Sequence, residues 1–201
     1  MTGEEATEHF RLFVAITVPD GVRENMLRVQ RELQSQVPHG VVRWTRPEQF
    51  HLTLRFLGDV PSGQVAGLLQ SLRAACAGVS PLPMRAHGVG FFPNARSPRV
   101  IWVGITDGAS GLLDLQQRIE RAVQPFAAEP GGERFAGHVT LGRLKPFQRQ
   151  QIRGLVAEAD TLTGRAFGEW TSREIELIRS ELLPAGPRYT SLAACQLGER
   201  C

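Results

Sequence analysis

Two short segments of this chain occur twice, in the same order and at almost the same spacing. The apolar segment LFVAIT at residues 12–17 resembles IWVGIT at residues 101–106, which lies 89 positions later. The segment HLTL at residues 51–54 resembles HVTL at residues 138–141, at an offset of 87 positions. An internal repeat constrains the architecture of a chain more strongly than any single motif does. We therefore interpret the sequence as a duplication.

The segments between these motifs also correspond. Apolar residues recur every three or four positions in residues 20–37 and again in residues 110–126, which is typical of a helix packed on one face. A second helix is expected after each H-x-T strand, with Pro146 in the first turn of the later one. Further strands are expected around residues 83–91 and 165–181. We predict an α+β fold of two duplicated lobes with mainly antiparallel sheet, outer helices and a central cleft on a pseudo-two-fold axis.

The composition is that of a folded protein. The chain has 201 residues, 42% of them hydrophobic and 21% charged, and we expect a single bilobal domain with repeat halves at about residues 10–95 and 96–195. No apolar run reaches the ~18–20 residues that a membrane-spanning helix needs. The acidic N-terminus, MTGEEATEHF, lacks the apolar region of a secretory signal. We expect a cytoplasmic protein with no membrane partner.

Cysteine and charge exclude some classes of site. The three cysteines form no C-x-x-C pair and are odd in number, so the sequence predicts neither a disulfide framework nor a zinc site. Cys76 falls on the apolar stripe of a predicted helix and is expected in the core. The net charge is only +3, although Lys145 is the only lysine and the other 22 basic residues are arginines. A bias in genomic composition is one explanation of the excess of arginine over lysine, and phosphate binding by arginine is another.

Two of the five histidines, His51 and His138, belong to the repeated motif. Alternate residues of a strand point to the same face, so His51 shares a face with Thr53, and His138 shares a face with Thr140. A lone H-x-T motif is usually structural. Two copies at equivalent points of a duplication predict one site with two imidazoles and two hydroxyls. The remaining histidines, which are expected on the surface or in structural roles, are His9, His39 and His87.

Two imidazoles in one site suit general acid–base catalysis at phosphorus. Imidazole titrates near pH ~6.5, so one ring can be neutral and the other protonated close to neutrality. One ring would take a proton from the nucleophile while the other protonates the leaving oxygen. The threonine hydroxyls would hold the non-bridging phosphate oxygens. The motifs lack a metal-ligand pattern, and the chain lacks a G-x-S-x-G turn and a P-loop. We therefore predict a phosphodiesterase without metal or cofactor.

Longer segments resemble the two-histidine phosphoesterases, and within them the bacterial and archaeal RNA 2',3'-cyclic phosphodiesterases, also called 2'-5' RNA ligases. These segments are RLFVAITVP, VRWTRPEQFHLTLRFLGDV, PRVIWVGI, GHVTLGRLK and EIELIRSELLPAGPRYTSL. The resemblance implies a bilobal fold with both motifs in a central cleft. It implies metal-independent hydrolysis of a terminal RNA 2',3'-cyclic phosphate to a 2'-phosphomonoester, with weak 2'-5' ligation in reverse.

The same resemblance assigns roles and partners. His51 would be the proton donor and His138 the proton acceptor, a distinction that the two chemically similar motifs do not make by themselves. The implied partners are RNA ends carrying a 2',3'-cyclic phosphate, including tRNA fragments, and no obligate protein partner. Gly137 departs from the family, which usually has proline directly before the second histidine. Glycine is expected to leave that histidine less rigidly placed.

Further substrate contacts are predicted near the two motifs. Arg55 lies four residues after the first histidine and shares its face if the strand is regular. Arg143 lies five residues after the second histidine, so it reaches the site only if a bulge or the strand end turns it. Phe56 is a candidate substrate contact, because its ring, like that of Trp44, suits stacking on an unpaired base. The simpler interpretation is that Phe56 packs in the core and Trp44 packs within its lobe. Tyr189, the only tyrosine, is expected in a strand after a turn.

Two other functions stay open from the sequence. A site of the same chemistry could act on a small cyclic nucleotide or on ADP-ribose cyclic phosphate. Alternatively, the histidines and arginines could bind the phosphate of an RNA end without catalysis. The first alternative predicts faster turnover of a small substrate than of an oligomer, whereas the second predicts binding without turnover.

Overall fold

The computed structural model describes residues 8–128, 131, 135–184 and 186–198, so most of the acidic N-terminus and Cys201 lie outside the described residues. The strands and helices follow the predicted order. The strands are β1 (His9–Thr17), β2 (Val42–Trp44), β3 (His51–Pro61), β4 (Leu82–Phe92), β5 (Val100–Thr106), β6 (His138–Leu144), β7 (Ala166–Ser172), β8 (Glu174–Leu183) and β9 (Gly186–Gln196). The helices are α1 (Asp20–Ser35), α2 (Val65–Cys76), α3 (Gly111–Val123) and α4 (Arg153–Thr161).

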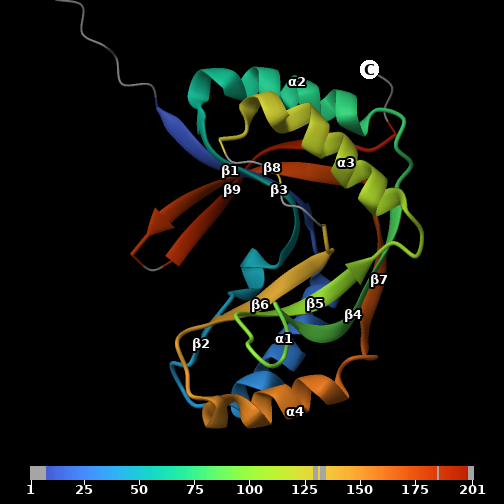
Figure 1. The fold of residues 1–201 in the computed structure, drawn as a ribbon. Helices are drawn as coiled ribbons and strands as arrows, with labels where there is room; N and C mark the ends of the chain where they lie inside the picture. Colours follow the sequence, from blue (N-terminus) through green and yellow to red (C-terminus); the bar gives the residue numbers. More distant parts are fainter. Residues whose placement is uncertain (1–7, 129–130, 132–134, 185, 199–201) are drawn as a thin grey trace, which may run out of the picture.

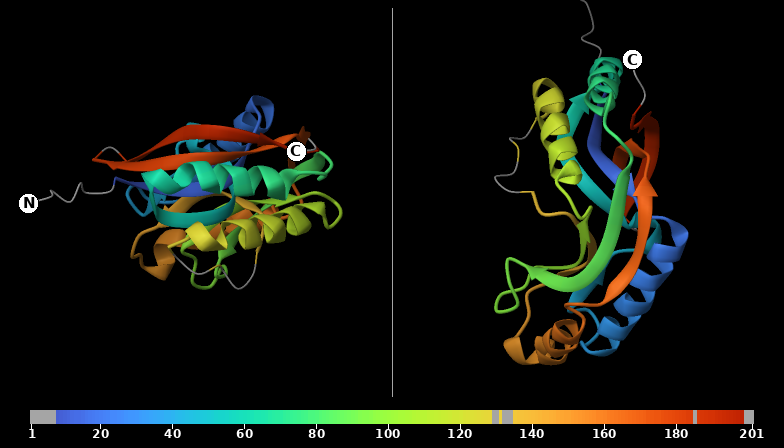
Figure 2. Two further views of the ribbon diagram at one scale, coloured as in Figure 1. Left: turned by 90° about the horizontal axis from the view of Figure 1, so that it is seen from above. Right: turned by 90° about the vertical axis from the view of Figure 1, so that its right-hand side faces the viewer.

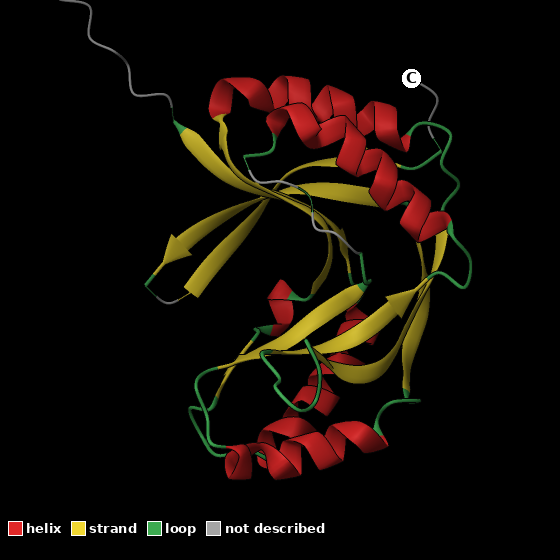
Figure 3. Cartoon of the chain, in the orientation of Figure 1, coloured by secondary structure: helices red, strands yellow, loops and turns green. Residues whose placement is uncertain are grey.

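The strands form two lobes, which confirms the predicted bilobal α+β fold. Their order is β7-β4-β5-β6-β3-β1-β8-β9, with β2 beside β6, and every recorded pairing is antiparallel. Figure 1 shows β1, β3, β8 and β9 with α2 and α3 in one lobe, and β4 to β7 with α1 and α4 in the other. The helices lie at the two outer ends with the strands between them (Figure 3).

Each lobe combines elements from both halves of the sequence, so a repeat half is not a lobe by itself. β4, from the first half, pairs with β5, and β8, from the second half, pairs with β1. The helices cross over in the same way: α1 packs against β7 and α4, whereas α3 packs against α2 and β3. Figure 2 shows these helix pairs at opposite ends of the molecule. The backbone pairing and helix packing within each lobe therefore join the two repeat halves to each other.

The predicted helical periodicity accounts for the burial of α1 and α3. In α3, for example, Leu112, Leu115, Ile119 and Val123 are all buried. Cys76 is buried at the end of α2, as expected. The predicted start of the last helix is wrong, because a 3-10 turn at residues 149–152 precedes α4 and Pro146 lies in the loop before it. Among the described residues, no helix has the length and apolar character needed to cross a membrane.

Candidate active site

The structure brings the two H-x-T motifs into one pocket between the lobes. β3 and β6 lie side by side and pair at a single position, Leu52 opposite Val139. In an antiparallel ladder the residues flanking such a pair face each other in reverse order. The first histidine is therefore opposite the second threonine, and the first threonine is opposite the second histidine. The pseudo-two-fold axis passes between Leu52 and Val139.

All four polar residues of the motifs line this pocket, whose volume is about 220 Å³: His51, Thr53, His138 and Thr140. The two histidines are diagonal neighbours across the ladder, and such neighbours lie roughly 7–8 Å apart in a regular sheet. A tetrahedral phosphate between two imidazoles fits a separation of this order. The remaining walls come from β2 and the turn that follows it, and from the start of β9.

Both imidazole rings are held in the same way. The Nδ1 atom of His51 lies 2.7 Å from the carbonyl oxygen of Gln49, and the Nδ1 atom of His138 lies 2.7 Å from the carbonyl oxygen of Ala136. Since a carbonyl only accepts hydrogen bonds, Nδ1 carries the proton in each neutral ring and Nε2 is left as the basic nitrogen. The Nε2 atom of His51 lies 3.0 Å from the Thr53 hydroxyl.

Both rings are neutral in the ligand-free protein near pH 7. Burial lowers the pKa of His51 from 6.5 to about 4; the hydrogen bond to Gln49 opposes this shift, and the charge of His138 adds to it. Burial also lowers the pKa of His138, against the hydrogen bond to Ala136 and with the charge of Arg143. Desolvation disfavours the imidazolium form in both cases. Burial therefore opposes, in the free protein, the protonated form that the sequence predicts one ring can adopt near neutrality.

Aromatic rings pack against both histidines, and the sequence prediction did not include them in the site. Tyr189 meets the ring of His51 edge-on, with centroids 5.4 Å apart and an interplanar angle of 81°. Phe92 meets His138 in the same manner, at 4.9 Å and 83°. Phe13 also contacts His51, at 4.8 Å. These contacts restrict the rotation of both imidazoles and contribute to their desolvation.

A bulge after each motif decides which neighbouring residues reach the pocket. The register shifts at Leu54 in the pairing of β3 with β1, and at Leu141 in the pairing of β6 with β5. One extra residue reverses the alternation of the side chains that follow. Phe56 and Arg143 consequently line the pocket. Phe56 is 53% exposed, so its expected place in the interior is wrong.

Other pocket residues come from β2, the turn after it and the start of β9, next to the β8–β9 turn. Trp44 lines the pocket and also packs against the hydrophobic core, as expected. Arg43, Arg46 and Gln49 line it as well, although the sequence prediction did not select them. The only signal for them was their place just before the first motif. The pocket is not lined by the three remaining histidines, His9, His39 and His87.

The family follows from a comparison with known proteins. A family model described as "LigT like Phosphoesterase" matches residues 16–102 and matches again at residues 103–189. The chain belongs to the LigT-like phosphoesterases. The two matches reproduce the duplication inferred from the repeated motifs, and each contains one H-x-T motif.

Relatives of this LigT-like phosphoesterase are similar over nearly their whole length. An RNA 2',3'-cyclic phosphodiesterase of Methanothermobacter thermautotrophicus is 32% identical, over 93% of this chain and 98% of the relative. One from Aquifex aeolicus is 30% identical, over 94% and 97%. The crystal structure of TT0787 of Thermus thermophilus has a TM-score of 0.76 at 32% identity, over 94% of this chain and all of that one. E. coli LigT complexed with 3'-AMP, at 23% identity and a TM-score of 0.73, shares the fold.

Arg55 does not line the pocket of this LigT-like phosphoesterase, contrary to the prediction that it binds substrate. The bulge at Leu54 turns its side chain into the interior, where it is 8% exposed and its Nε atom lies 3.0 Å from Oε2 of Glu120 on α3. A buried guanidinium needs a partner because burial of an unpaired charge is costly. The ion pair therefore joins β3 of the first repeat to α3 of the second, which is a structural task.

We expect Glu120→Ala to lower the free energy of unfolding by about 1–3 kcal/mol, because it removes a charged partner from the buried Arg55. The KM for substrate should change less than twofold, since neither residue lines the pocket. Urea unfolding and steady-state kinetics measure the two quantities. As a control, Glu169→Ala breaks the exposed pair with Arg85, which should contribute less than about 1 kcal/mol. A raised KM with unchanged stability would contradict this account and indicate that Arg55 takes part in substrate binding.

Gly137 is enclosed, so the expectation that it leaves the second motif loosely placed is not supported. Its carbonyl accepts a hydrogen bond from the Ile105 amide at 2.9 Å. A Cβ atom at position 137 would lie 2.5 Å from the carbonyl oxygen of Ile105, which is closer than real Cβ contacts. Glycine therefore lets β5 approach the backbone directly before His138, and β5 holds that backbone in place.

No group of three or more histidine, cysteine, aspartate or glutamate side chains suited to holding a metal ion occurs in the part of the chain that the structure describes. The donors around the pocket are instead imidazole, hydroxyl and guanidinium groups. Such donors bind an anion, and the imidazoles can also transfer protons.

Proposed function

We propose that this protein hydrolyses the 2',3'-cyclic phosphate at an RNA end to a 2'-phosphomonoester, with His51 as proton donor and His138 as proton acceptor. The observation that carries the proposal is the facing pair of H-x-T motifs, in which each imidazole is held through Nδ1 and keeps Nε2 for proton transfer. The names of the curated relatives support the same reaction and substrate.

The proposed step is an in-line displacement at phosphorus. Nε2 of His138 takes a proton from water as the water oxygen bonds to phosphorus. The bond between phosphorus and the 3'-oxygen breaks, and Nε2–H of His51 gives its proton to that oxygen. The products are a 3'-hydroxyl and a 2'-phosphate. His138 ends protonated and His51 neutral, and exchange with solvent restores the starting state.

The other polar residues of the pocket have holding roles in this proposal. The hydroxyls of Thr53 and Thr140 donate hydrogen bonds to the non-bridging phosphate oxygens, whose charge grows in the transition state. The Arg143 guanidinium offers two parallel donors to the same group. Phe56 presents an exposed ring on which a base of the bound RNA can stack.

His51 must take up from solvent, as the substrate binds, the proton that it later donates, because the lowered pKa leaves the ring neutral in the free protein. A nearby anion stabilises imidazolium and raises its pKa. The cyclic phosphate carries such a charge, so the proton is taken up together with the substrate. Before the substrate binds, the Thr53 hydroxyl donates a hydrogen bond to Nε2 of His51. After proton uptake, Nε2 carries a proton and donates it to the leaving oxygen.

Two further expectations accompany the function. The reverse reaction, in which an RNA 5'-hydroxyl replaces water, would form a 2'-5' linkage with the same two histidines in exchanged roles. The substrates would be cytoplasmic RNA fragments with cyclic ends, among them tRNA fragments. The proposal requires no protein partner.

The test is hydrolysis of an RNA oligomer that ends in a 2',3'-cyclic phosphate, in buffer containing excess EDTA. We expect undiminished turnover relative to chelator-free buffer, and an oligomer with a terminal 2'-phosphate as the product. Phosphorus NMR distinguishes the 2'-phosphate from the 3'-phosphate. A 3'-phosphate product would overturn the assigned leaving oxygen, loss of activity in EDTA would overturn the metal-free mechanism, and binding without turnover would overturn catalysis itself.

A further inference from the structure

A second pocket, of about 350 Å³, adjoins the active site. It shares four lining residues with the active-site pocket: Phe56, Arg143, Pro187 and Tyr189. It extends along β1 and β8 of the first lobe and is also lined by Arg11 and Leu182. Because the shared residues form a common wall, a chain bound with its end at the two histidines can continue into this second pocket.

The second pocket is lined by two exposed apolar side chains as well as by polar ones. Leu182 is 71% exposed and Phe56 is 53% exposed, and both are among the few large hydrophobic side chains exposed in the described part of the chain. An aromatic ring beside an exposed leucine offers a flat contact for an unpaired base, which stacks without regard to its identity. These two residues therefore suit a nucleoside.

Two arginines, Arg11 and Arg143, also line the same pocket. Arg11 is exposed and Arg143 lies at the wall shared with the active site; neither forms an ion pair with a described acidic residue. Both line the pocket together with Tyr189, and the charges of both act on its hydroxyl. An RNA chain presents one phosphate per nucleotide, so two neighbouring arginines suit two successive phosphates.

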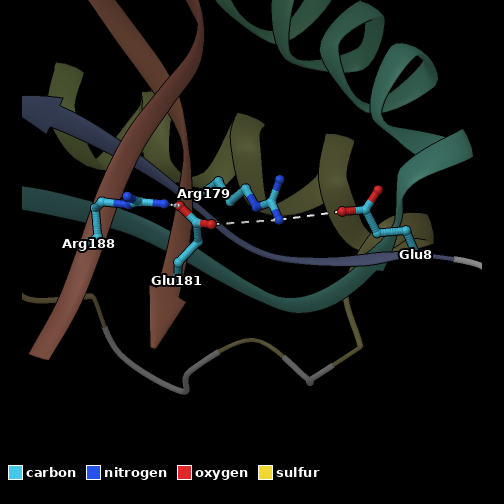
Figure 4. A network of polar contacts seen from close by, with 4 residues as sticks. All are labelled: Glu8, Arg179, Glu181 and Arg188. Carbon is cyan, nitrogen blue, oxygen red and sulfur yellow. Dashed lines mark hydrogen bonds and ion pairs between the residues drawn. The ribbon is translucent and has the colours of Figure 1, made fainter. Parts of the chain in front are cut away.

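The arginines on the other face of the β8–β9 hairpin are arranged differently. Arg179 pairs with Glu8 and Glu181, and Arg188 pairs with Glu181 (Figure 4). Alternation along the strands puts this network on the face opposite to Tyr189, whose strand partner is Ser180. The carboxylates thus pair with the arginines on the face away from the pocket, whereas no ion pair joins Arg11 or Arg143 to a described acidic residue.

We propose that the second pocket is a subsite for the nucleotide that precedes the cyclic end, with Arg11 bound to the phosphodiester between the two nucleotides and with Phe56 and Leu182 against the base. This inference rests on the proposed function, and it makes an RNA chain the preferred substrate over a cyclic mononucleotide. A mononucleotide leaves the subsite empty and gains nothing from Arg11.

The test compares three substrates: 2',3'-cyclic AMP, the dinucleotide ApA ending in a 2',3'-cyclic phosphate, and the same dinucleotide with a neutral methylphosphonate between its nucleosides. The wild-type protein should show a kcat/KM for the charged dinucleotide about tenfold above that for the neutral one. Arg11→Gln should abolish this difference and leave kcat/KM for 2',3'-cyclic AMP within twofold. Arg188→Gln, on the opposite face, is the matched control and should retain the difference.

The outcomes separate the subsite from the reaction. Equal losses on the dinucleotide and on 2',3'-cyclic AMP in Arg11→Gln would overturn the subsite, because Arg11 would then contact the terminal nucleotide. Equal wild-type rates on the charged and neutral dinucleotides would also overturn it while leaving the proposed reaction intact. If the wild-type protein hydrolyses none of the three substrates, the proposed function is overturned and the subsite with it.

Discussion

Replacing either His51 or His138 with alanine should lower kcat/KM for an RNA end with a 2',3'-cyclic phosphate by about 10³-fold, within the range of 10²–10⁴ that a positioned acid or base contributes. The double variant should be at most about tenfold slower than either single variant, because groups that act in one concerted step lose their effect together. Folding should be unaffected, since each ring lies at a pocket wall. Single-turnover rates and circular dichroism measure both expectations.

The chain contains a matched control for these variants. His87 is also a strand histidine near a threonine hydroxyl, with Nε2 lying 3.4 Å from Oγ1 of Thr106, but it lies outside the pocket. His87→Ala should retain activity within about twofold. If His87→Ala lost as much activity as the other two variants, their loss would be explained by general damage to the fold.

A change of leaving group separates the two roles. A cyclic substrate with sulfur in place of the 3'-oxygen needs little protonation, because a thiol has a pKa near ~8.5 and leaves as an anion. His51→Ala should recover most of its lost rate on this substrate, whereas His138→Ala should stay slow. Recovery in His138→Ala and not in His51→Ala would show that His138 is the donor and His51 the acceptor.

Gly137→Ala should both destabilise the protein and slow the reaction. The added methyl group would lie 2.5 Å from the Ile105 carbonyl oxygen, so the backbone must shift, and overpacking of this kind costs about 1–3 kcal/mol. The Nδ1 atom of His138 bonds to the carbonyl of Ala136, only one residue before the change. A shift there moves the imidazole, and a misplacement of about 1 Å can cost roughly 10²-fold in rate.

Gly63→Ala is the control for that substitution, because a Cβ atom at position 63 meets nothing within 4 Å. It should leave the rate unchanged and keep or slightly raise the stability, since alanine restricts the unfolded chain more than glycine does. Urea unfolding and kcat/KM should be measured on both variants. Wild-type stability and rate in Gly137→Ala would show that the contact with β5 does not position the second histidine.

The architecture was largely predictable because the spacing of apolar residues and the repeated motifs indicate its strands and helices. The three- and four-residue spacing of Leu112, Leu115 and Ile119 predicts α3, and all three residues are buried there. The two H-x-T strands were predictable from their repetition alone. The exchange of strands between the halves was not, because periodicity determines which face of an element is buried but not which neighbour covers it.

The composition of the site was only partly predictable. The bulges at Leu54 and Leu141 add one residue each without a sequence signal, and they exclude Arg55 from the pocket while admitting Arg143. Tyr189 reaches the first histidine only through the long-range pairing of β8 with β1 and β9. The lowered pKa of His51 arises mainly from burial, which no local motif specifies.

The most direct test of the central claim, that two paired histidines exchange protons with the substrate, is the pH dependence of kcat/KM in EDTA. This parameter reports the free protein, in which burial lowers the pKa of His51 to about 4 and also lowers that of His138. The singly protonated pair exists only between the two pKa values. Activity should therefore fall below the lower and above the higher of them, giving a bell with its maximum below pH 6.5.

The kcat profile should lie at higher pH than the kcat/KM profile, because the bound phosphate anion raises both pKa values. Each single histidine variant should lose one limb of the bell. A kcat/KM that does not change between about pH 4 and 8, or a bell that persists unchanged in His51→Ala or His138→Ala, would contradict the account.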